Sequence, residues 1–153
     1  MRRLVDDAGL AEAVVVDSAG TAGYHVGEGS DRRTVAEAHR RGLAADHRAR
    51  QLQASELSSW DLILVMDEAN ERDVRDLARA DRPGPSVFGE RTRLLRSFDA
   101  LAVASGELEV SDPYYDDDAA FAVVFDQVER ACQGLLQEVR RVVDSVGREA
   151  RSA

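Results

Sequence analysis

The sequence predicts an α/β protein with a parallel sheet, and three observations support this fold class. Short apolar runs within Ala13–Val16 and Asp61–Met66 are typical of buried strands. Segments with helix-capping residues alternate with these runs along the chain. Polar residues directly follow both runs, and ligands of parallel sheets bind at the carboxyl ends of the strands. We therefore expect a single domain over residues 1–153 with a site at this edge of the sheet.

Capping residues place the helices of the first half. Leu4–Leu10 is typical of the end of a helix, because Gly9 stands at a C-cap position. Ser30 or Asp31 can cap a helix that runs to about Arg41 and that Gly42 terminates. The segment Ser55–Trp60 is predicted to form a short helical turn. The segment between the first strand and the capped helix, 18–29, is rich in Gly and Ser and is predicted to be a loop.

The second half ends in a long amphipathic helix. Asp67 can cap a helix to about Ala80, residues 81–90 are predicted to form a loop, and Arg93–Phe98 resembles a further short strand. Residues 99–118 are irregular and acidic. From Asp118 on, apolar residues recur at three-four spacing, which predicts one buried stripe on a helix. Its members are Phe121, Val124, Phe125, Val128, Cys132, Leu135, Val139 and Val142. The polar residues 147–153 are expected to form a disordered tail.

Charge and composition exclude several classes of protein. The chain has 20 basic residues, all arginine, against 29 acidic residues, so its net charge of −9 argues against a nucleic-acid binder. No apolar run is long enough to span a membrane. The single cysteine, Cys132, excludes an internal disulfide framework and a multi-cysteine zinc site, and fits a cytoplasmic protein.

Asp112-Pro113-Tyr114-Tyr115 is the most specific local motif. Proline holds the preceding aspartate in an extended conformation, and the two aromatic rings could desolvate its carboxyl group. A carboxylic acid placed in this way can protonate a poor leaving group, while paired tyrosines can form the walls of a slot for a flat ring. The alternative, which the pattern alone favours, is an acidic turn anchored by two tyrosines.

The other polar motifs have simpler alternatives. Ser18 to Thr21 could be a hydroxyl-rich turn that supports a phosphate loop, or a plain turn after a strand. His47 is a lone histidine, and Asp67 with Asn70 is most simply a helix cap and its neighbour. The acidic run 116–118 is expected from a helix dipole rather than from a metal site. Cys132 lies on the apolar stripe, where a thiol stays protonated and inert.

Taken together, the motifs occur in the order found in one family. The chain resembles the low-molecular-weight protein-tyrosine phosphatases over residues 2 to about 141. The matching stretches are Val16-Asp17-Ser18-Ala19-Gly20-Thr21, Tyr24-His25-Val26-Gly27, His47-Arg48-Ala49-Arg50-Gln51-Leu52, Leu62 to Asn70, and Asp112-Pro113-Tyr114-Tyr115.

The resemblance implies a fold, a reaction and a set of site residues. The implied fold is a doubly wound, four-stranded parallel sheet with helices on both faces. The implied reaction is hydrolysis of phosphotyrosine in proteins, or of aryl phosphates, through a cysteinyl phosphate and without metal or cofactor. Asp112 resembles the general acid and base. The ring walls of the slot would be Tyr24, Tyr114 and Tyr115, and the supporting shell would be Ser18, His47, Asp67 and Asn70.

The chain departs from the family pattern at its N-terminus. The first central strand and the Cys-x5-Arg phosphate loop that the family implies are not among these 153 residues, because Glu138 stands six residues after Cys132. We therefore expect an N-terminally truncated phosphatase domain that is inactive by itself. Two alternatives remain: a catalytically dead remnant that acts as a binding or interaction protein, and an arsenate reductase-like enzyme.

Overall fold

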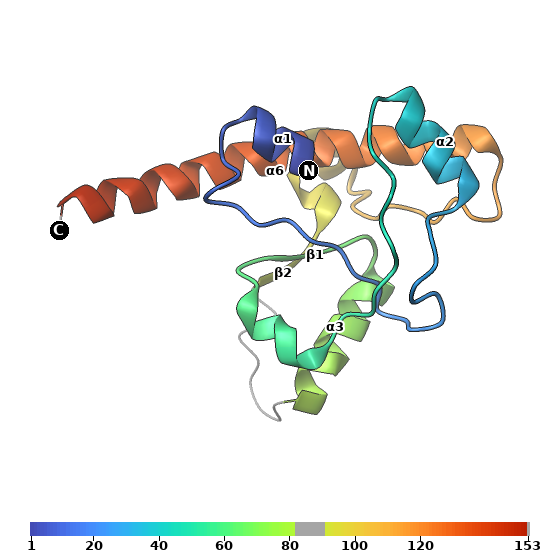
Figure 1. Ribbon diagram of the computed structural model, residues 1–153, viewed down its shortest axis with the longest axis horizontal. Helices are drawn as coiled ribbons and strands as arrows, with labels where there is room; N and C mark the ends of the chain where they lie inside the picture. Colours follow the sequence, from blue (N-terminus) through green and yellow to red (C-terminus); the bar gives the residue numbers. More distant parts are fainter. Residues whose placement is uncertain (82–90, 153) are drawn as a thin grey trace.

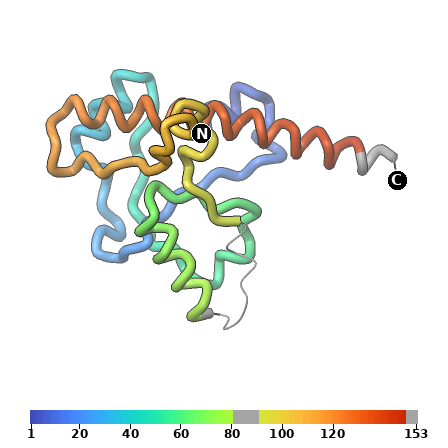
Figure 2. Tube along the Cα trace, turned by 180° about the vertical axis from the view of Figure 1, so that it is seen from behind, coloured from blue at the N-terminus to red at the C-terminus, as the bar shows by residue number. Residues whose placement is uncertain are grey.

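A long C-terminal helix, α6 (Asp118–Ser152), organises the molecule (Figure 1). The computed structural model describes residues 1–81 and 91–152. Helices α1 (Arg2–Asp7) and α2 (Arg32–Arg40) lie along α6, whose C-terminal part extends beyond the rest of the molecule, as Figure 2 shows from behind. Below them lie a small sheet, the 3₁₀ helix η1 (Ala54–Ser59) and helix α3 (Glu68–Asp81).

The sheet separates two apolar clusters. Strands β1 (Ile63–Val65) and β2 (Thr92–Leu94) pair in parallel, with Ile63 opposite Thr92. Successive side chains of a strand point to opposite faces. On one face, Ile63 and Val65 pack with η1 and α3 in a cluster around Leu57, Val74 and Ala78. On the other face, Leu64 packs with α1 and α6 in a cluster around Leu95, Ala131 and Cys132. The predicted α/β class, a parallel sheet with helices on both faces, is therefore confirmed.

The predicted strand Ala13–Val16 is wrong. Within the described ranges the sheet consists of β1 and β2, and residues 14–19 have no regular secondary structure. Val15 is 80% exposed, and the carbonyl oxygen of Val16 accepts a hydrogen bond of 2.9 Å from the Arg2 guanidinium. A strand is stable only when a neighbour takes up its backbone groups, and here a side chain from α1 does so instead.

The region between β2 and α6 is more regular than predicted. Of the predicted strand Arg93–Phe98, only Arg93 and Leu94 lie in β2, and Leu95–Phe98 forms the 3₁₀ helix η2. Helix α5 (Ala100–Ser105) then occupies part of the segment predicted to be irregular. Asp99 caps α5 by accepting a hydrogen bond of 3.0 Å from the Leu101 amide, and Gly106 ends it with a left-handed φ of 78°.

The predicted caps and the buried stripe of α6 are largely confirmed. Asp31 caps α2 by accepting from the Arg33 amide at 2.7 Å, and Asp67 accepts from the Asn70 amide at 2.6 Å. Phe121, Cys132 and Leu135 are buried, whereas Val142 is 53% exposed. Helix α6 extends to Ser152, and the expectation of a disordered tail over residues 147–153 stays a prediction. The predicted loop at 81–90 lies, apart from Asp81, outside the described residues.

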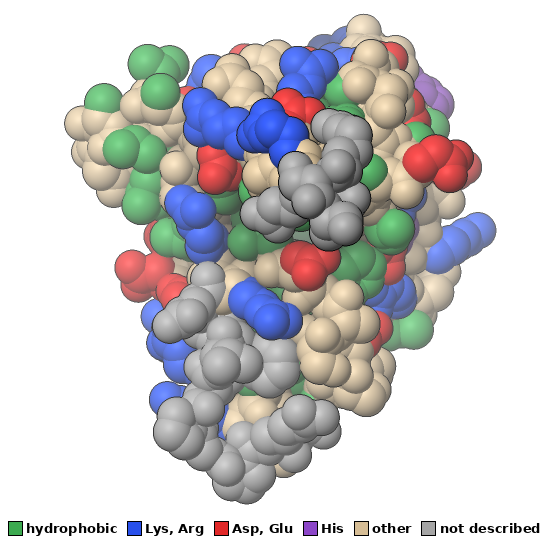
Figure 3. Space-filling view, turned by 90° about the vertical axis from the view of Figure 1, so that its left-hand side faces the viewer, with side chains coloured by type: hydrophobic (Ala, Val, Ile, Leu, Met, Phe, Trp, Pro, Cys, Tyr) green, Lys and Arg blue, Asp and Glu red, His purple; other side chains and the backbone are tan. Residues whose placement is uncertain are grey.

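Arginine side chains fasten α2 to α6. The Arg41 guanidinium, just after α2, donates to Glu129 at 3.3 Å and to the carbonyl oxygen of Ala122 at 3.1 Å, and pairs with Asp126 at 2.7 Å. It also bonds the buried Glu37 of α2 at 2.6 Å. These contacts fix the C-terminal end of α2 on α6. Arginine and acidic side chains also lie interspersed on the face of the molecule shown in Figure 3.

Candidate active site

The Asp-Pro-Tyr-Tyr motif forms a tight turn between α5 and α6. The Asp112 carboxylate accepts a hydrogen bond of 3.0 Å from the Tyr114 amide, and the Pro113 carbonyl accepts from the Asp116 amide at 2.9 Å. Such a bond from an aspartate to the amide two residues on is an Asx turn, which fixes the direction of the carboxylate. The Asp112 side chain is exposed, so the expected desolvation by its aromatic neighbours is not observed.

The two tyrosines of the turn form an open aromatic corner. The rings of Tyr114 and Tyr115 meet edge to face, with centroids 5.0 Å apart and an interplanar angle of 87°. The exposed fractions of the residues are 56% and 95%. Two neighbouring aromatic rings that are exposed to solvent in this way are available to bind a flat ligand.

Tyr24 lies on a different loop. Its ring packs edge to face on His25 at 4.6 Å, and His25 Nδ1 lies 2.7 Å from a carboxylate oxygen of Glu28. Tyr24 is 79% exposed. Within residues 1–81 and 91–148, no hydrogen bond, ion pair or ring contact joins Tyr24 to the turn at Asp112.

The loop that carries Ser18 is held by an ion-pair network. Asp17 accepts from the Arg50 guanidinium at 2.7 and 3.0 Å and from Arg2 at 3.2 Å. The Ser18 amide and the Arg50 guanidinium hold the pKa of the Asp17 carboxyl below its ordinary value. Arg50 also binds Glu56 at 2.8 Å. The carboxylate therefore stays charged, and its bonds define the path of the backbone into Ser18.

The remaining supporting residues lie on segments that are bonded to this loop. The Gly20 amide donates to the Arg50 carbonyl at 2.9 Å, and the Thr21 hydroxyl donates to Asp73 of α3 at 2.7 Å. The segment that carries His47 and helix α3 are thereby connected to the loop. Asn70 lies in the first turn of α3, and Asp67 directly precedes the helix. Of the four described supporting residues, only Asp67 and Asn70 are joined to each other by a direct hydrogen bond. The side chain of His47 is exposed.

One residue that sequence analysis missed fastens the turn to the body of the protein. The Arg33 guanidinium of α2 donates to the carbonyl oxygens of Tyr114 and Asp116, both at 2.9 Å. It also forms a bidentate pair with Asp31 at 3.1 Å. The sequence signal was weak, because Arg33 is one of many arginines and its partners lie more than 80 residues further along the chain.

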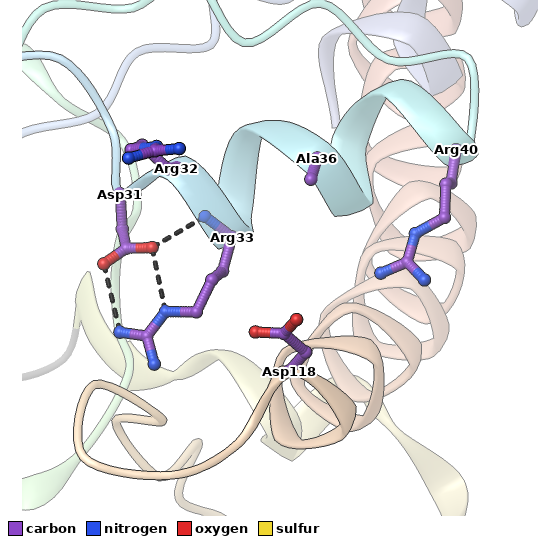
Figure 4. Close-up of a pocket in the computed structure, with 6 residues that line it drawn as sticks. All are labelled: Asp31, Arg32, Arg33, Ala36, Arg40 and Asp118. Atoms are coloured by element: carbon purple, nitrogen blue, oxygen red, sulfur yellow. Dashed lines mark hydrogen bonds and ion pairs between the residues drawn. The ribbon is translucent and has the colours of Figure 1, made fainter.

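A cavity of about 450 Å³ lies between α2 and the start of α6 (Figure 4). Its lining residues are Asp31, Arg32, Arg33, Ala36, Arg40 and Asp118. None of the residues predicted for the site is among them. Figure 4 shows Arg33 turned towards Asp31, and Arg40 is paired with Glu37, so the guanidinium groups of these two arginines already have carboxylate partners.

Cys132 is a core residue, as predicted. It is 6% exposed and packs in the cluster with Leu95 and Ala131. Burial raises the pKa of its thiol above the ordinary value, because a thiolate loses its hydration in an apolar environment. Among the residues that the structure describes, no three His, Cys, Asp or Glu side chains are grouped so that they could hold a metal ion. No helix in the described part of the chain is both long and apolar enough to cross a membrane.

Comparison with known proteins gives one consistent result. Residues 1–145 match the family described as low molecular weight phosphotyrosine protein phosphatase. A low molecular weight protein-tyrosine-phosphatase of Streptomyces coelicolor is 46% identical over 143 residues, which cover 94% of this chain and 84% of the relative. The human low molecular weight phosphotyrosine protein phosphatase is 35% identical over 137 residues, 90% of this chain and 82% of the relative.

A solved structure agrees with these relatives. The crystal structure of a protein tyrosine phosphatase from Entamoeba histolytica, with Hepes in its active site, has a TM-score of 0.80 and 27% identity. The match covers 92% of this chain and 84% of the Entamoeba histolytica chain. The chain therefore belongs to the low molecular weight phosphotyrosine protein phosphatase family, whose members are hydrolases.

Proposed function

We propose that this chain supplies the acid-base and ring-binding part of a protein-tyrosine phosphatase site. The observation that carries the proposal is the turn at Asp112, where an exposed, directed carboxylate stands beside two exposed tyrosine rings. A phosphotyrosine side chain presents a flat ring next to the bridging oxygen that must be protonated on leaving. The substrate is therefore phosphotyrosine in a protein, with small aryl phosphates as analogues.

Asp112 has two tasks in this proposal. As a thiolate attacks phosphorus and the bond from phosphorus to the phenolic oxygen breaks, the Asp112 carboxylic acid gives its proton to that oxygen. The resulting carboxylate then takes a proton from the water that attacks the cysteinyl phosphate. The bond from sulfur to phosphorus breaks, which releases phosphate and regenerates both the thiolate and the Asp112 carboxylic acid. Tyr24, Tyr114 and Tyr115 form walls for the ring. Ser18, His47, Asp67 and Asn70 support the loop that holds the phosphoryl group.

The nucleophile of this proposal is not Cys132. Its burial, its raised pKa and the glutamate six residues further on all argue against attack by this thiol. We propose that a Cys-x5-Arg loop outside these 153 residues provides the nucleophile, so that the 153-residue chain hydrolyses phosphate esters at most very slowly. Loss of a nucleophile typically removes about four to six powers of ten in rate.

The test compares the 153-residue chain with a chain extended through the coding frame upstream of Met1. We expect hydrolysis of 4-nitrophenyl phosphate only by the extended chain. In that chain, Asp112→Asn should slow turnover of substrates with poor leaving groups about 10²- to 10⁴-fold. The matched control is Glu107→Gln, which removes one charge from an exposed residue of the same connecting segment.

Either of two results would overturn the proposal. One is equal activity of the Asp112→Asn and Glu107→Gln variants of the extended chain towards substrates with poor leaving groups. The other is an upstream frame without a Cys-x5-Arg loop, in which case a folded, inactive chain would support a binding role instead. Arsenate reduction is tested by supplying arsenate with a thiol reductant to the same proteins.

A further inference from the structure

Arg33 is unusual among the arginines of α2 because nearly all of its hydrogen-bonding capacity is used. Its Nη1 donates to the Asp116 carbonyl at 2.9 Å, and its Nη2 donates to the Tyr114 carbonyl at 2.9 Å. Nε and Nη2 bind the two carboxylate oxygens of Asp31, each at 3.1 Å. A planar guanidinium is suited to this task, since its donors point in fixed directions and can bind several acceptors at once.

Two aromatic rings complete the environment of this guanidinium. The Arg33 carbon Cζ lies 4.3 Å from the ring centroid of the buried Phe121 and 5.8 Å from that of Tyr114. Both distances are within the range of cation–π attraction. Arg33 therefore contacts the turn through backbone carbonyls and through the ring of one of its tyrosines.

Hydrogen bonds also fix Arg33 to the start of α2. Asp31 is fixed as the N-cap of α2, because one of its oxygens also accepts from the Arg33 amide at 2.7 Å. Hydrogen bonds from Arg33 hold the pKa of the Asp31 carboxyl below its ordinary value, and the bond to Asp31 raises the pKa of Arg33, so both groups stay charged at neutral pH. The C-terminal end of α2 is fastened to α6 through Arg41.

The neighbouring Arg32 provides the contrast. It is exposed, and within the described part of the chain its side chain has no hydrogen-bond or ion-pair partner. It has the same charge and lies in the same turn of α2, so it is a matched control for any effect of charge or helix propensity.

We infer that Arg33 is a positioning residue, which holds the turn 112–116 in place from α2 and thereby sets where Asp112 and the ring of Tyr114 stand. This inference rests on the proposed function in so far as it concerns catalysis. It assigns no chemical step to Arg33, whose bonds go to backbone carbonyls of the turn and to Asp31.

The first test does not require a catalytically active protein. Amide hydrogen exchange is measured in the 153-residue chain for the wild type, Arg33→Met, Arg33→Lys and Arg32→Met. The informative amides are those of Tyr114 and Asp116, whose acceptors are Asp112 and Pro113 within the turn. We expect Arg33→Met to accelerate their exchange by about tenfold or more, Arg33→Lys to have a smaller effect, and Arg32→Met to have none.

Amides of α3 act as an internal control for global unfolding, because α3 packs in the other apolar cluster. If α3 amides also accelerate in Arg33→Met, Arg33→Lys decides the question, since it retains the charge and part of the bonding. Unchanged exchange in the turn of that variant would then overturn the inference, as would exchange in Arg33→Met equal to that in Arg32→Met.

The second test separates positioning from a general structural role, and it uses the active, extended chain. Arg33→Met should lower kcat/KM for phenyl phosphate about 10-fold or more, while kcat/KM for 4-nitrophenyl phosphate changes little. This parameter covers the steps up to departure of the phenol, and in those steps only the poor leaving group depends on the acid. Arg33→Lys should recover part of the loss. An equal fall in kcat/KM for both substrates would show that Arg33 has only a general structural role, and would refute the inference. Absence of activity in every chain would refute the proposed function, while the exchange experiment would still decide whether Arg33 holds the turn.

Discussion

Helix α6 passes η2 at Gly134 so closely that no side chain fits between them. A Cβ atom on Gly134 would stand 3.0 Å from the carbonyl carbon of Phe98 and in severe overlap with its oxygen. The obstacle is backbone, which cannot turn away as a flexible side chain can. The substitution Gly134→Ala therefore forces α6 and η2 apart.

The expected size of this effect follows from two opposing contributions. Overpacking in a well-packed region costs about 1–3 kcal/mol, and a clash with backbone belongs at the upper end of that range. In the opposite direction, alanine stabilises a helix interior by about 1 kcal/mol relative to glycine. The free energy of unfolding should therefore fall by about 2 kcal/mol, which lowers Tm by roughly 4–8 °C in a domain of this size.

Thermal denaturation followed by circular dichroism measures this effect in the 153-residue chain. The control is Gln133→Ala, which places alanine on the adjacent, exposed position of the same helix. We expect a change within about 0.5 kcal/mol for the control. If Gly134→Ala melts at or above the wild-type temperature, α6 and η2 are not in backbone contact, and the packing described for this face of the sheet is wrong.

Three further predictions concern single carboxylates and the thiol. Asp99 is 3% exposed, caps α5 and accepts from Arg130 at 3.0 Å, so Asp99→Ala should cost about 2 kcal/mol in urea denaturation, whereas Glu138→Ala at an exposed ion pair should cost under about 0.5 kcal/mol. The thiol of Cys132, buried and with a raised pKa, should react with a thiol reagent at pH 8 only when the chain unfolds; immediate, stoichiometric labelling would contradict its place in the core. The Asp31 pKa is lowered below its ordinary 3.8, so Asp31 contributes stability that is fully present above that value and is lost as the pH falls through the lower folded-state pKa. The stability difference between wild type and Asp31→Asn should thus be constant near neutral pH and shrink below about pH 4; a difference that grows on acidification would refute the assignment.

Local signals in the sequence predicted the elements whose stability is local. Asp31, Asp67 and Asp118 stand at or next to helix starts, and the apolar stripe places α6 against the core. The same kind of signal was available for α5, because Asp99 and Gly106 bracket an alanine-rich segment. That helix could have been predicted, and the acidic character of the surrounding segment obscured it.

Strand formation at residues 13–16 could not be decided from local pattern. Four apolar residues in a row are compatible with a buried strand, but a strand also needs backbone partners, and those are a property of the whole fold. Arg2 takes up one of these backbone groups through a contact 14 residues away in sequence. Similarly, the type of residue at 33 gave no hint of its role, since the role depends on carbonyls beyond residue 113.

The two halves of the candidate site are therefore assembled in different ways. The loop of Ser18, the segment of His47 and the start of α3 are linked by direct bonds, from Gly20 to Arg50 and from Thr21 to Asp73. The turn at Asp112 belongs to a second group, held from α2 by Arg33 and joined to α6 through the adjoining chain. Within the described residues no hydrogen bond joins the Ser18 loop to the Asp112 turn itself. The segment just before the turn is bonded to the start of α3, since the Val110 amide donates to the Met66 carbonyl and the Glu68 amide donates to the Glu109 carboxylate, both at 2.8 Å. The relative position of the two groups therefore depends on these bonds and on the packing of α2 and α6 against the rest of the protein. In the proposed reaction one phosphotyrosine must reach both groups at once, its ring at the tyrosines and its phosphoryl group near the loop. Small shifts of α2 should then alter the chemistry more than the fold, which is why an arginine remote from the phosphoryl group can control the acid.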